Sequence, residues 1–170
     1  MSYTKELKLS LLHVNTKKCC GLSELEALLH TGGELSLSGG RPGIDFTTEL
    51  EPLAGRVLSL IRELTGAEPR MLMRRKNQPR RMTLYVIELD GDKTQIVFEK
   101  FGRDGVLSEI RLPEKECCLR AALRGAFLGC GMLADPNKQY LMEFSASGDM
   151  SGRYIQSLLD KLNISYGENY

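Results

Sequence analysis

The chain has 170 residues, of which 42% are apolar and 26% charged, and its formal net charge is only +1. This length and composition suit one medium globular domain or two small halves that share a core, and the charge balance excludes a general affinity for polyanions. No apolar run approaches the ~18–20 residues that span a bilayer, and charged residues interrupt positions 1–10, where a signal peptide would be apolar, so we expect a cytoplasmic location.

The spacing of apolar residues predicts helices alternating with hairpins. We first expect a helix at 3–13, a helix at 17–31 and a hairpin at 35–48 that turns at 38–43. A helix at 52–65 and a second hairpin follow, with strands at 69–76 and 82–90 and a turn at 77–79. A helix that ends at 101, a loop at 102–105 and an extended segment at 106–112 complete this part. We expect the first hairpin to bury one face, with Leu35, Leu37, Ile44 and Phe46 inside. Asp92 is the predicted cap of the helix that ends at 101.

The second part of the chain repeats this order, with a helix at 114–129, a hairpin at 131–147 and a helix at 151–163. Residues 17–66 align with residues 115–164 at a constant offset of 98, without a gap. Ten of the 50 positions are identical, where unrelated sequences of this composition would share about three. The identical pairs are Lys17/Lys115, Cys19/Cys117, Cys20/Cys118, Leu25/Leu123, Gly33/Gly131, Leu35/Leu133, Phe46/Phe144, Ser59/Ser157, Leu60/Leu158 and Leu64/Leu162.

Two copies of a supersecondary unit usually pack about a pseudo-two-fold axis. We therefore predict an α+β fold with two related halves, residues 1–112 and 113–170, in which helices pack on antiparallel hairpins. The alternative is two similar stretches with no symmetry between them. The second copy stops at Tyr170, without the hairpin and helix that follow the first copy, so we expect the natural protein to continue beyond this point.

Small residues recur near the end of the first helix in each copy, and a glycine follows each helix. These residues are Ala27, Thr31 and Gly33 in the first copy, and Gly125, Gly129 and Gly131 in the second. Small residues four positions apart leave a smooth stripe along which two helices can approach each other backbone to backbone. The pattern predicts that these two helices form the interface between the halves.

The segment Leu123-Arg-Gly-Ala-Phe-Leu-Gly-Cys-Gly131 resembles the motif of LAGLIDADG homing endonucleases at its first, third and ninth positions, and Leu25-Glu-Ala-Leu-Leu-His-Thr-Gly-Gly33 matches it more weakly. The chain also resembles, over essentially its whole length, the N-terminal part of the WhiA family of bacterial sporulation and cell-division regulators. That resemblance rests on residues Lys17–Leu29, Leu123–Pro136 and Tyr140–Phe144. It implies a C-terminal helix-turn-helix domain, absent from these 170 residues, that reads DNA sequence.

The resemblance to LAGLIDADG endonucleases does not extend to the residues that such enzymes need for catalysis. A LAGLIDADG nuclease places one carboxylate near the end of each motif helix, and the pair holds divalent metal at the scissile phosphates. The corresponding eighth positions of the motifs are Gly32 and Cys130, and neither offers an oxygen ligand. Glu34 and Asp135 follow these positions, and we interpret them as ordinary solvated carboxylates. A nuclease with relocated acids stays a remote alternative.

No other catalytic or metal-binding pattern occurs in the sequence. The five cysteines form the vicinal pairs Cys19–Cys20 and Cys117–Cys118, plus Cys130, and no C-x-x-C or histidine spacing typical of zinc sites accompanies them. We expect small, half-buried thiols in a reducing compartment. Neither a phosphate-binding loop nor a Ser/His/Asp set is present, so we predict no enzyme activity, no cofactor and no small-molecule substrate.

Six basic residues and no acidic residue lie within positions 70–81: Arg70, Arg74, Arg75, Lys76, Arg80 and Arg81. In the fold that the chain resembles, the two sheets form a concave surface along duplex DNA, and this hairpin would lie on its flank. We therefore predict weak, salt-dependent DNA contact in a nucleoid-associated regulator. Asp45, Glu49 and Glu143 would place negative charge near the phosphates. The alternative is a protein-interaction scaffold without a nucleic-acid role.

Overall fold

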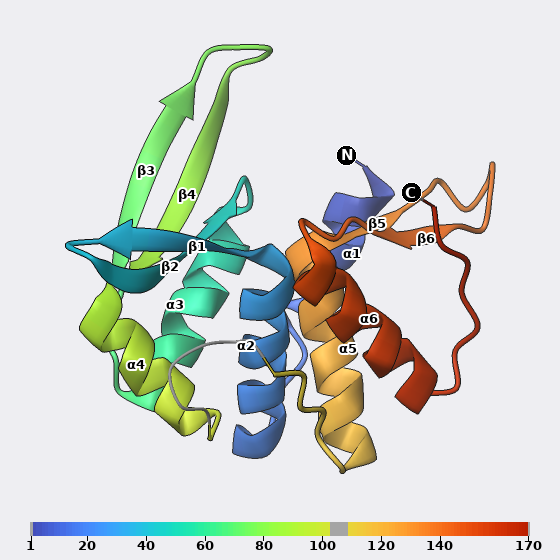
Figure 1. Cartoon of the computed structure of the whole chain (residues 1–170). Coiled ribbons are helices and arrows are strands. Elements are labelled where there is room, and N and C mark those ends of the chain that lie inside the picture. The colour runs from blue at the N-terminus through green and yellow to red at the C-terminus, as the bar shows by residue number, and fades with distance from the viewer. Residues whose placement is uncertain (1, 103–108, 170) are drawn as a thin grey trace.

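Two helices of 15 residues, α2 (Lys18–Gly32) and α5 (Glu116–Cys130), lie side by side at the centre of the molecule (Figure 1). The structure is a computed structural model that describes residues 2–102 and 109–169. Each helix ends where the chain turns directly into a strand: the N–H of Gly33 donates to the carbonyl of Leu29, and the N–H of Gly131 donates to that of Phe127. The strands β1 (Gly33–Ser38) and β5 (Gly131–Leu133) therefore begin at the same end of the helix pair.

The first half is a four-stranded antiparallel sheet in the order β1-β2-β4-β3, with helices packed against one face (Figure 1). Its elements after α2 are β1 (Gly33–Ser38), β2 (Arg41–Thr48), α3 (Glu51–Thr65), β3 (Arg70–Lys76), β4 (Met82–Leu89) and α4 (Gly91–Lys100). Pro52 occupies the first turn of α3, and Gly66 ends that helix in the left-handed conformation, with a φ of 77°. The β3–β4 hairpin projects well beyond the helices.

The second half repeats the start of the first half with the same strand register. It contains α5, β5 (Gly131–Leu133), β6 (Met142–Phe144) and α6 (Asp149–Lys161). Gly33 lies opposite Phe46 in the β1–β2 pair, and Gly131 lies opposite Phe144 in the β5–β6 pair. Each residue of the second pair follows its counterpart by 98 positions, so the duplicated fold that the sequence predicted is confirmed. Within the described residues, the second half has no counterpart of β3, β4 and α4.

Each half has its own hydrophobic core, and each central helix also contributes to the core of the other half. Leu128 of α5 packs in the cluster formed by α2, α3, α4 and the four-stranded sheet. Ala27 of α2 packs in the cluster formed by α5 and α6. The His30 ring of α2 stacks on the Tyr154 ring of α6, with the ring centroids 4.4 Å apart. The halves therefore share buried surface and are not independent units.

Helix α1 (Tyr3–Leu11) covers the free edge of β5. The Thr4 hydroxyl donates to the carbonyl of Leu133 at 3.1 Å and accepts the Leu133 N–H at 2.9 Å. The Asn137 side-chain amide donates to the Tyr3 hydroxyl. Because an open strand edge invites pairing with another chain, these contacts protect the β5 edge of the short second sheet.

Most predicted elements are confirmed with small shifts in their ends, but three expectations were wrong. Leu35 and Leu37 are 69% and 82% exposed, whereas Ile44 and Phe46 are buried, because β1 is an edge strand that the helices leave uncovered. The cap of α4 is Asp90; Asp92 lies in the first turn and forms an ion pair with Arg41. The strands of the second hairpin cover only 131–133 and 142–144.

Part of the predicted loop at 102–105 and of the extended segment at 106–112 lies outside the described residues, because positions 103–108 are not described. No helix within residues 2–102 or 109–169 combines the length and the apolar character that crossing a membrane requires.

The close approach of α2 and α5 depends on two glycines of α5. A Cβ at Gly125 would meet the Ala27 Cβ at 3.0 Å and the Glu24 carbonyl oxygen at a still shorter distance. A Cβ at Gly129 would meet the Gly32 backbone nitrogen at 3.1 Å and also the Thr31 hydroxyl. The Thr31 hydroxyl donates to the Ala27 carbonyl within its own helix, at 2.8 Å. Neither glycine position has room for a side chain.

We expect the substitution Gly125→Ala to lower the free energy of unfolding by about 1–3 kcal/mol, because the added methyl group overpacks the helix contact. Gly55→Ala in α3 is the matched control. A Cβ at Gly55 would meet nothing within 4 Å, so this change should raise stability by up to about 1 kcal/mol through helix propensity alone. Urea unfolding followed by circular dichroism measures both. Equal stabilisation by the two variants would contradict the packing of α2 on α5.

Candidate functional site

The ends of α2 and α5, where a nuclease of this fold would hold its metal, carry no carboxylate. A Cβ at Gly32 would lie 2.6 Å from the Phe46 ring and 3.1 Å from the Gly129 Cα, so the position has no space for an acidic side chain. Cys130 is half-buried, and burial raises the pKa of its thiol to about 11, although the nearby Lys8 ammonium acts in the opposite direction. The Lys8 ammonium itself lies over the Phe127 ring. The polar groups at this end of the helix pair are therefore the neutral Cys130 thiol and the Lys8 ammonium.

The two acids nearest to these positions belong to separate local structures. Glu34 lies on β1 directly opposite Asp45 of β2. A side-chain oxygen of Asp135 accepts the N–H of Asn137 at 2.9 Å, within the turn between β5 and β6. Asp135 therefore has a local role in its own turn, whereas Glu34 lies exposed on β1 beside another acid.

The remaining small residues of the predicted interface divide into two groups. Ala27, Thr31, Gly125 and Gly129 lie where α2 meets α5, as described above. Gly33 and Gly131 instead lie at the helix-to-strand turns, where a Cβ would meet Leu29 and Phe127 of the same half.

The six basic residues of the β3–β4 hairpin are spread over both faces of the ribbon. Because side chains alternate along a strand, Arg70, Arg74 and Lys76 share one face of β3, and Arg75 lies on the other face. Arg80 and Arg81 lie in the segment between the strands. All seven residues of β3 are exposed.

Acidic neighbours pair with half of these basic groups. Glu88 forms ion pairs with Arg70, at 3.0 Å, and with Arg74, at 3.5 Å. Glu49 pairs with Arg80 at 2.9 Å. Among the described residues, Arg75, Lys76 and Arg81 have no ion-pair partner. These three cations are the ones most available to an external anion.

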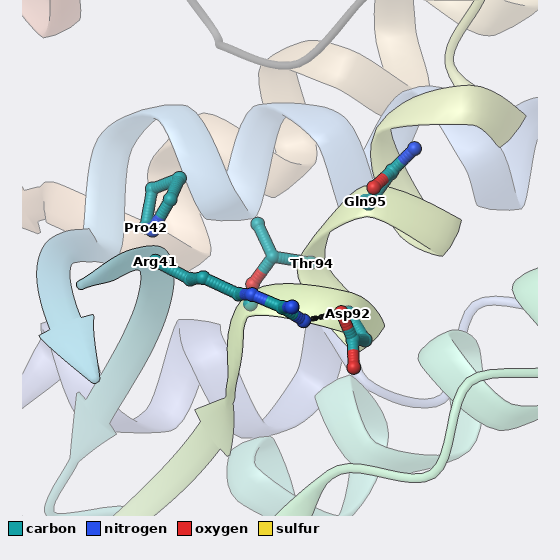
Figure 2. A pocket seen from close by; sticks show the side chains of 6 residues that line it. Arg41, Pro42, Asp92, Thr94 and Gln95 are labelled. Carbon is teal, nitrogen blue, oxygen red and sulfur yellow. Dashed lines mark hydrogen bonds and ion pairs between the residues drawn. The ribbon is translucent and has the colours of Figure 1, made fainter. Parts of the chain in front are cut away.

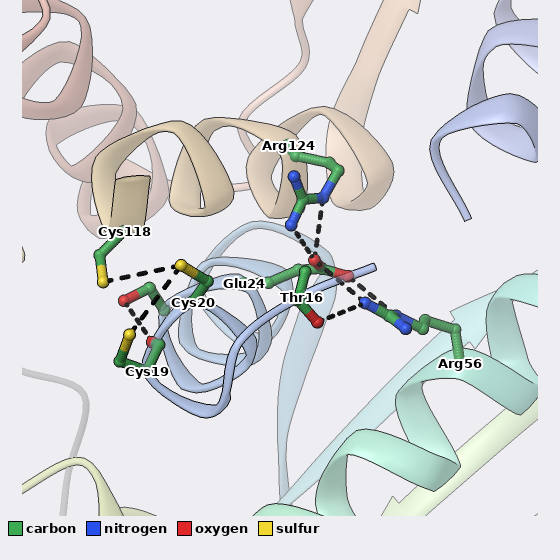
Figure 3. A network of polar contacts seen from close by, with 8 residues as sticks. Thr16, Cys19, Cys20, Glu24, Arg56, Cys118 and Arg124 are labelled. Atoms are coloured by element: carbon green, nitrogen blue, oxygen red, sulfur yellow. Dashed lines mark hydrogen bonds and ion pairs between the residues drawn. The ribbon is translucent and has the colours of Figure 1, made fainter. Parts of the chain in front are cut away.

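A buried ion network joins the two halves at the middle of the helix pair (Figure 3). The Glu24 carboxylate, with a side chain only 1% exposed, accepts from Arg124 of α5 at 2.6 Å and from Arg56 of α3 at 3.1 Å. Arg56 also donates to the Thr16 hydroxyl at 3.1 Å. The network thus ties α2, α3 and α5 together. Sequence analysis did not find it, because its members lie 32 and 100 residues from one another.

The two vicinal cysteine pairs meet at the N-terminal ends of α2 and α5. Figure 3 shows Cys19, Cys20 and Cys118 of this group. The Sγ atoms of Cys20 and Cys118 lie 4.0 Å apart, although these residues are 98 positions apart in the chain. Burial raises the pKa of Cys20 to about 12 and also raises the pKa of Cys118, whereas a hydrogen bond from Cys118 lowers the pKa of Cys19. The offset of 98 between the pairs was the sequence signal for this meeting.

A shallow depression of about 300 Å³ lies between β2 and α4 (Figure 2). The Arg41 side chain reaches across it to the Asp92 carboxylate. The Thr94 hydroxyl donates to the Leu89 carbonyl, and the Gln95 amide donates to Glu99. Because these polar groups already bind partners inside the protein, we assign no ligand to this depression.

Comparison with known proteins relates this geometry to one family. A family model described as the WhiA N-terminal LAGLIDADG-like domain matches residues 18–102, and a model described as the WhiA LAGLIDADG-like domain matches residues 119–168. The chain belongs to the WhiA family. The two matched segments contain α2 and most of α5 respectively, whereas the predicted division at residues 112 and 113 falls between them and stays a prediction.

Curated WhiA relatives are about twice as long as this chain. A probable cell division protein WhiA of Geobacillus thermodenitrificans is 30% identical over 166 residues, which cover 94% of this chain and 52% of the relative. One of Bacillus mycoides is 35% identical over 141 residues, which cover 80% and 45%. The chain therefore spans about half the length of these relatives.

Solved structures show the same fold. The crystal structure of the N-terminal LAGLIDADG domain of DUF199/WhiA superposes with a TM-score of 0.69 at 19% identity, covering 98% of this chain and 77% of that one. The full-length DUF199/WhiA from Thermatoga maritima superposes with a TM-score of 0.66 at 20% identity, covering 98% and 53%. At such identities the likeness shows the fold alone.

We expect Glu24→Gln to lower the free energy of unfolding of this WhiA-family chain by about 3 kcal/mol, because two partly buried guanidinium groups lose their counter-charge. Glu116→Gln is the matched control. Its partner Arg120 lies 2.7 Å away, but both side chains are more than 70% exposed, so the loss should stay below about 1 kcal/mol. Urea unfolding compares the variants. Similar losses for both would show that the buried network contributes no more to stability than an exposed ion pair does.

Proposed function

We propose that this chain is the non-catalytic, LAGLIDADG-like part of a bacterial regulator of cell division and sporulation that acts at the nucleoid. The observation that carries the proposal is the replacement of both metal-binding acids at the paired helix ends. Gly32 has no space for a side chain, and Cys130 presents a neutral thiol. A fold kept without the groups that cut DNA is suited to binding or to positioning another domain.

The curated relatives support a role in cell division, because their names describe probable cell division proteins. These relatives extend well beyond the length of this chain. We propose that sequence-specific DNA recognition belongs to the remaining part of the whole protein, as the helix-turn-helix domain of the family implies. The contribution of the present chain to DNA binding would then be weak and independent of sequence.

The projecting β3–β4 hairpin supports DNA contact through this chain. Arg75, Lys76 and Arg81 are exposed and, within the described residues, have no ion-pair partner. A phosphate backbone recognises such cations by charge alone, and each phosphate neutralised contributes about 0.9 to the slope of log affinity against log salt. The hairpin thus fits a backbone contact that positions the protein but does not select a sequence.

A scaffold that binds protein and not DNA is the second candidate. Glu88 and Glu49 already pair with Arg70, Arg74 and Arg80, which reduces the positive charge that the hairpin offers to DNA. Leu35 and Leu37 expose most of their apolar surface at the edge of the same sheet. Large exposed apolar side chains are typical of protein-interaction surfaces.

We expect the chain to bind duplex DNA in gel shifts at about 50 mM salt, and the triple change Arg75→Glu/Lys76→Glu/Arg81→Glu to abolish the shift. The physical reason is the loss of up to three phosphate contacts, worth about 2.7 in the salt slope. Lys5→Glu/Lys100→Glu/Arg153→Glu, on the exposed surfaces of α1, α4 and α6, changes the net charge equally and should bind more strongly than the hairpin variant. Equal losses in both variants would show a general charge effect. Absence of binding by the unchanged chain would favour the scaffold.

We also expect supercoiled plasmid to stay intact when incubated with the chain and Mg²⁺ or Mn²⁺, because oxygen ligands are missing at Gly32 and Cys130. Agarose electrophoresis measures nicking. If nicking occurs and disappears in Glu34→Gln/Asp135→Asn, the relocated acids cut DNA and the non-catalytic proposal is wrong. Nicking that persists in this variant would contradict the proposal as well and would place the metal elsewhere.

A further inference from the structure

Four thiols gather at the end of the central helix pair opposite to the degenerate motif positions. Cys19 and Cys20 lie in the first turn of α2, and Cys117 and Cys118 lie in the first turn of α5. The two helices run in the same direction side by side (Figure 1). The internal repeat therefore brings the two vicinal pairs together, and Figure 3 shows Cys19, Cys20 and Cys118. Among residues 2–102 and 109–169, no histidine or acidic residue belongs to the group of possible ligands formed by Cys19, Cys20 and Cys118.

The distances between the sulfur atoms are those of a metal–thiolate site. The Sγ atoms of Cys19 and Cys20, of Cys20 and Cys118, and of Cys117 and Cys118 are each 4.0 Å apart. The sulfurs of Cys19, Cys20 and Cys118 all lie within 4.8 Å of one another. Zn–S bonds of about 2.3 Å place the sulfurs of a tetrahedral site about 3.8 Å apart, whereas a disulfide bond requires about 2.05 Å. The sulfurs of Cys19, Cys20 and Cys118 are therefore close to the spacing of a tetrahedral metal site, and the Cys117 sulfur lies next to that of Cys118.

Burial raises the pKa of the Cys20 and Cys118 thiols, but other features of the surroundings suit thiolate ligands. Cys20 and Cys118 are buried against Ala121, and Cys19 and Cys117 reach the surface, so an ion has both a protected side and a path of entry. The N-terminal ends of two helices converge here, and their dipoles favour negative charge. Lys17 and Lys115 occupy the N-cap positions of these helices and add positive charge on both sides.

We propose that Cys19, Cys20, Cys117 and Cys118 form a thiolate site for one zinc ion, which links the two halves at the N-terminal ends of α2 and α5. Cys19, Cys20 and Cys118 supply three ligands from their present positions. Cys117, next to Cys118, supplies the fourth after rotation of its side chain. Binding replaces the thiol protons by the metal, and these protons pass to the solvent. The site has a structural role, because four protein ligands leave no open position for a substrate.

Sequence patterns for zinc did not find this site because they search for ligands close together in the chain, such as C-x-x-C. Here each ligand pair is vicinal, and the two pairs are separated by 98 residues. The site is independent of the proposed DNA contact, since the cysteines lie on the central helices and the basic residues lie on the β3–β4 hairpin.

Cobalt binding tests the proposal directly. The reduced, tag-free 170-residue chain is titrated anaerobically with Co²⁺, a spectroscopic probe that shows thiolate charge-transfer and tetrahedral ligand-field bands. We expect an end point of one Co²⁺ per chain, displacement of the bands by Zn²⁺, and a higher melting temperature with Zn²⁺ than with a chelator. A folded, reduced chain without these bands would overturn the proposal.

Cysteine variants identify the ligands. We expect Cys20→Ser and Cys118→Ser to weaken Co²⁺ binding by more than about a hundredfold, since even residues that only support metal ligands change affinity by 10–100-fold. Because these buried changes can impair folding, Cys19→Ser/Cys117→Ser at the surface is the second variant, with circular dichroism as the check on folding. It should fold and lose the tetrahedral bands. Cys130→Ser, at the other end of α5, is the matched control and should bind as the unchanged chain does. Unchanged binding by the surface double variant would overturn the four-thiolate site.

Discussion

The contact between α2 and α5 is the constraint on which the rest of the molecule depends. Gly125 and Gly129 let the backbones approach so closely that the carbonyl of Glu24 and the hydroxyl of Thr31 occupy the space of the missing side chains. This approach sets the relation between the halves, because each central helix continues directly into the first strand of its own sheet. It also lets each helix place an apolar residue in the core of the other half. Removal of either helix would therefore open both cores.

Three different chemistries lie along this one helix pair. At the C-terminal ends, Gly32 is tightly packed and Cys130 carries a half-buried thiol. In the middle, the charge of Glu24 is neutralised by guanidinium groups from both halves, which makes burial of a carboxylate tolerable. At the N-terminal ends, the repeat brings four thiols together. The Glu24 ion pairs and the cysteine cluster therefore both lie where the two halves contact each other.

The projecting hairpin gives the chain its one strongly basic element within the described residues, and its electrostatics are more balanced than the sequence indicated. Alternation along β3 divides the cations between two faces. Glu88 from the neighbouring strand and Glu49 from the loop after β2 neutralise three of them. The six positive charges within twelve residues of sequence therefore overestimate the positive electrostatic potential around the hairpin. The remaining cations suit an auxiliary contact better than a principal binding surface.

The amino-acid sequence by itself determined the order of the elements, the duplication and the lack of a carboxylate at Gly32 and Cys130, because periodicity, glycine stops and residue identity are local properties. It also indicated that Gly125 and Gly129 would be needed for helix packing. Only the tertiary structure decided which side chains meet across the chain: the exposure of Leu35 and Leu37 at a sheet edge, the partners of Glu24, and the distances among the cysteine sulfurs. These outcomes depend on contacts between residues that are far apart in the chain, and residue spacing along the sequence does not reveal such contacts.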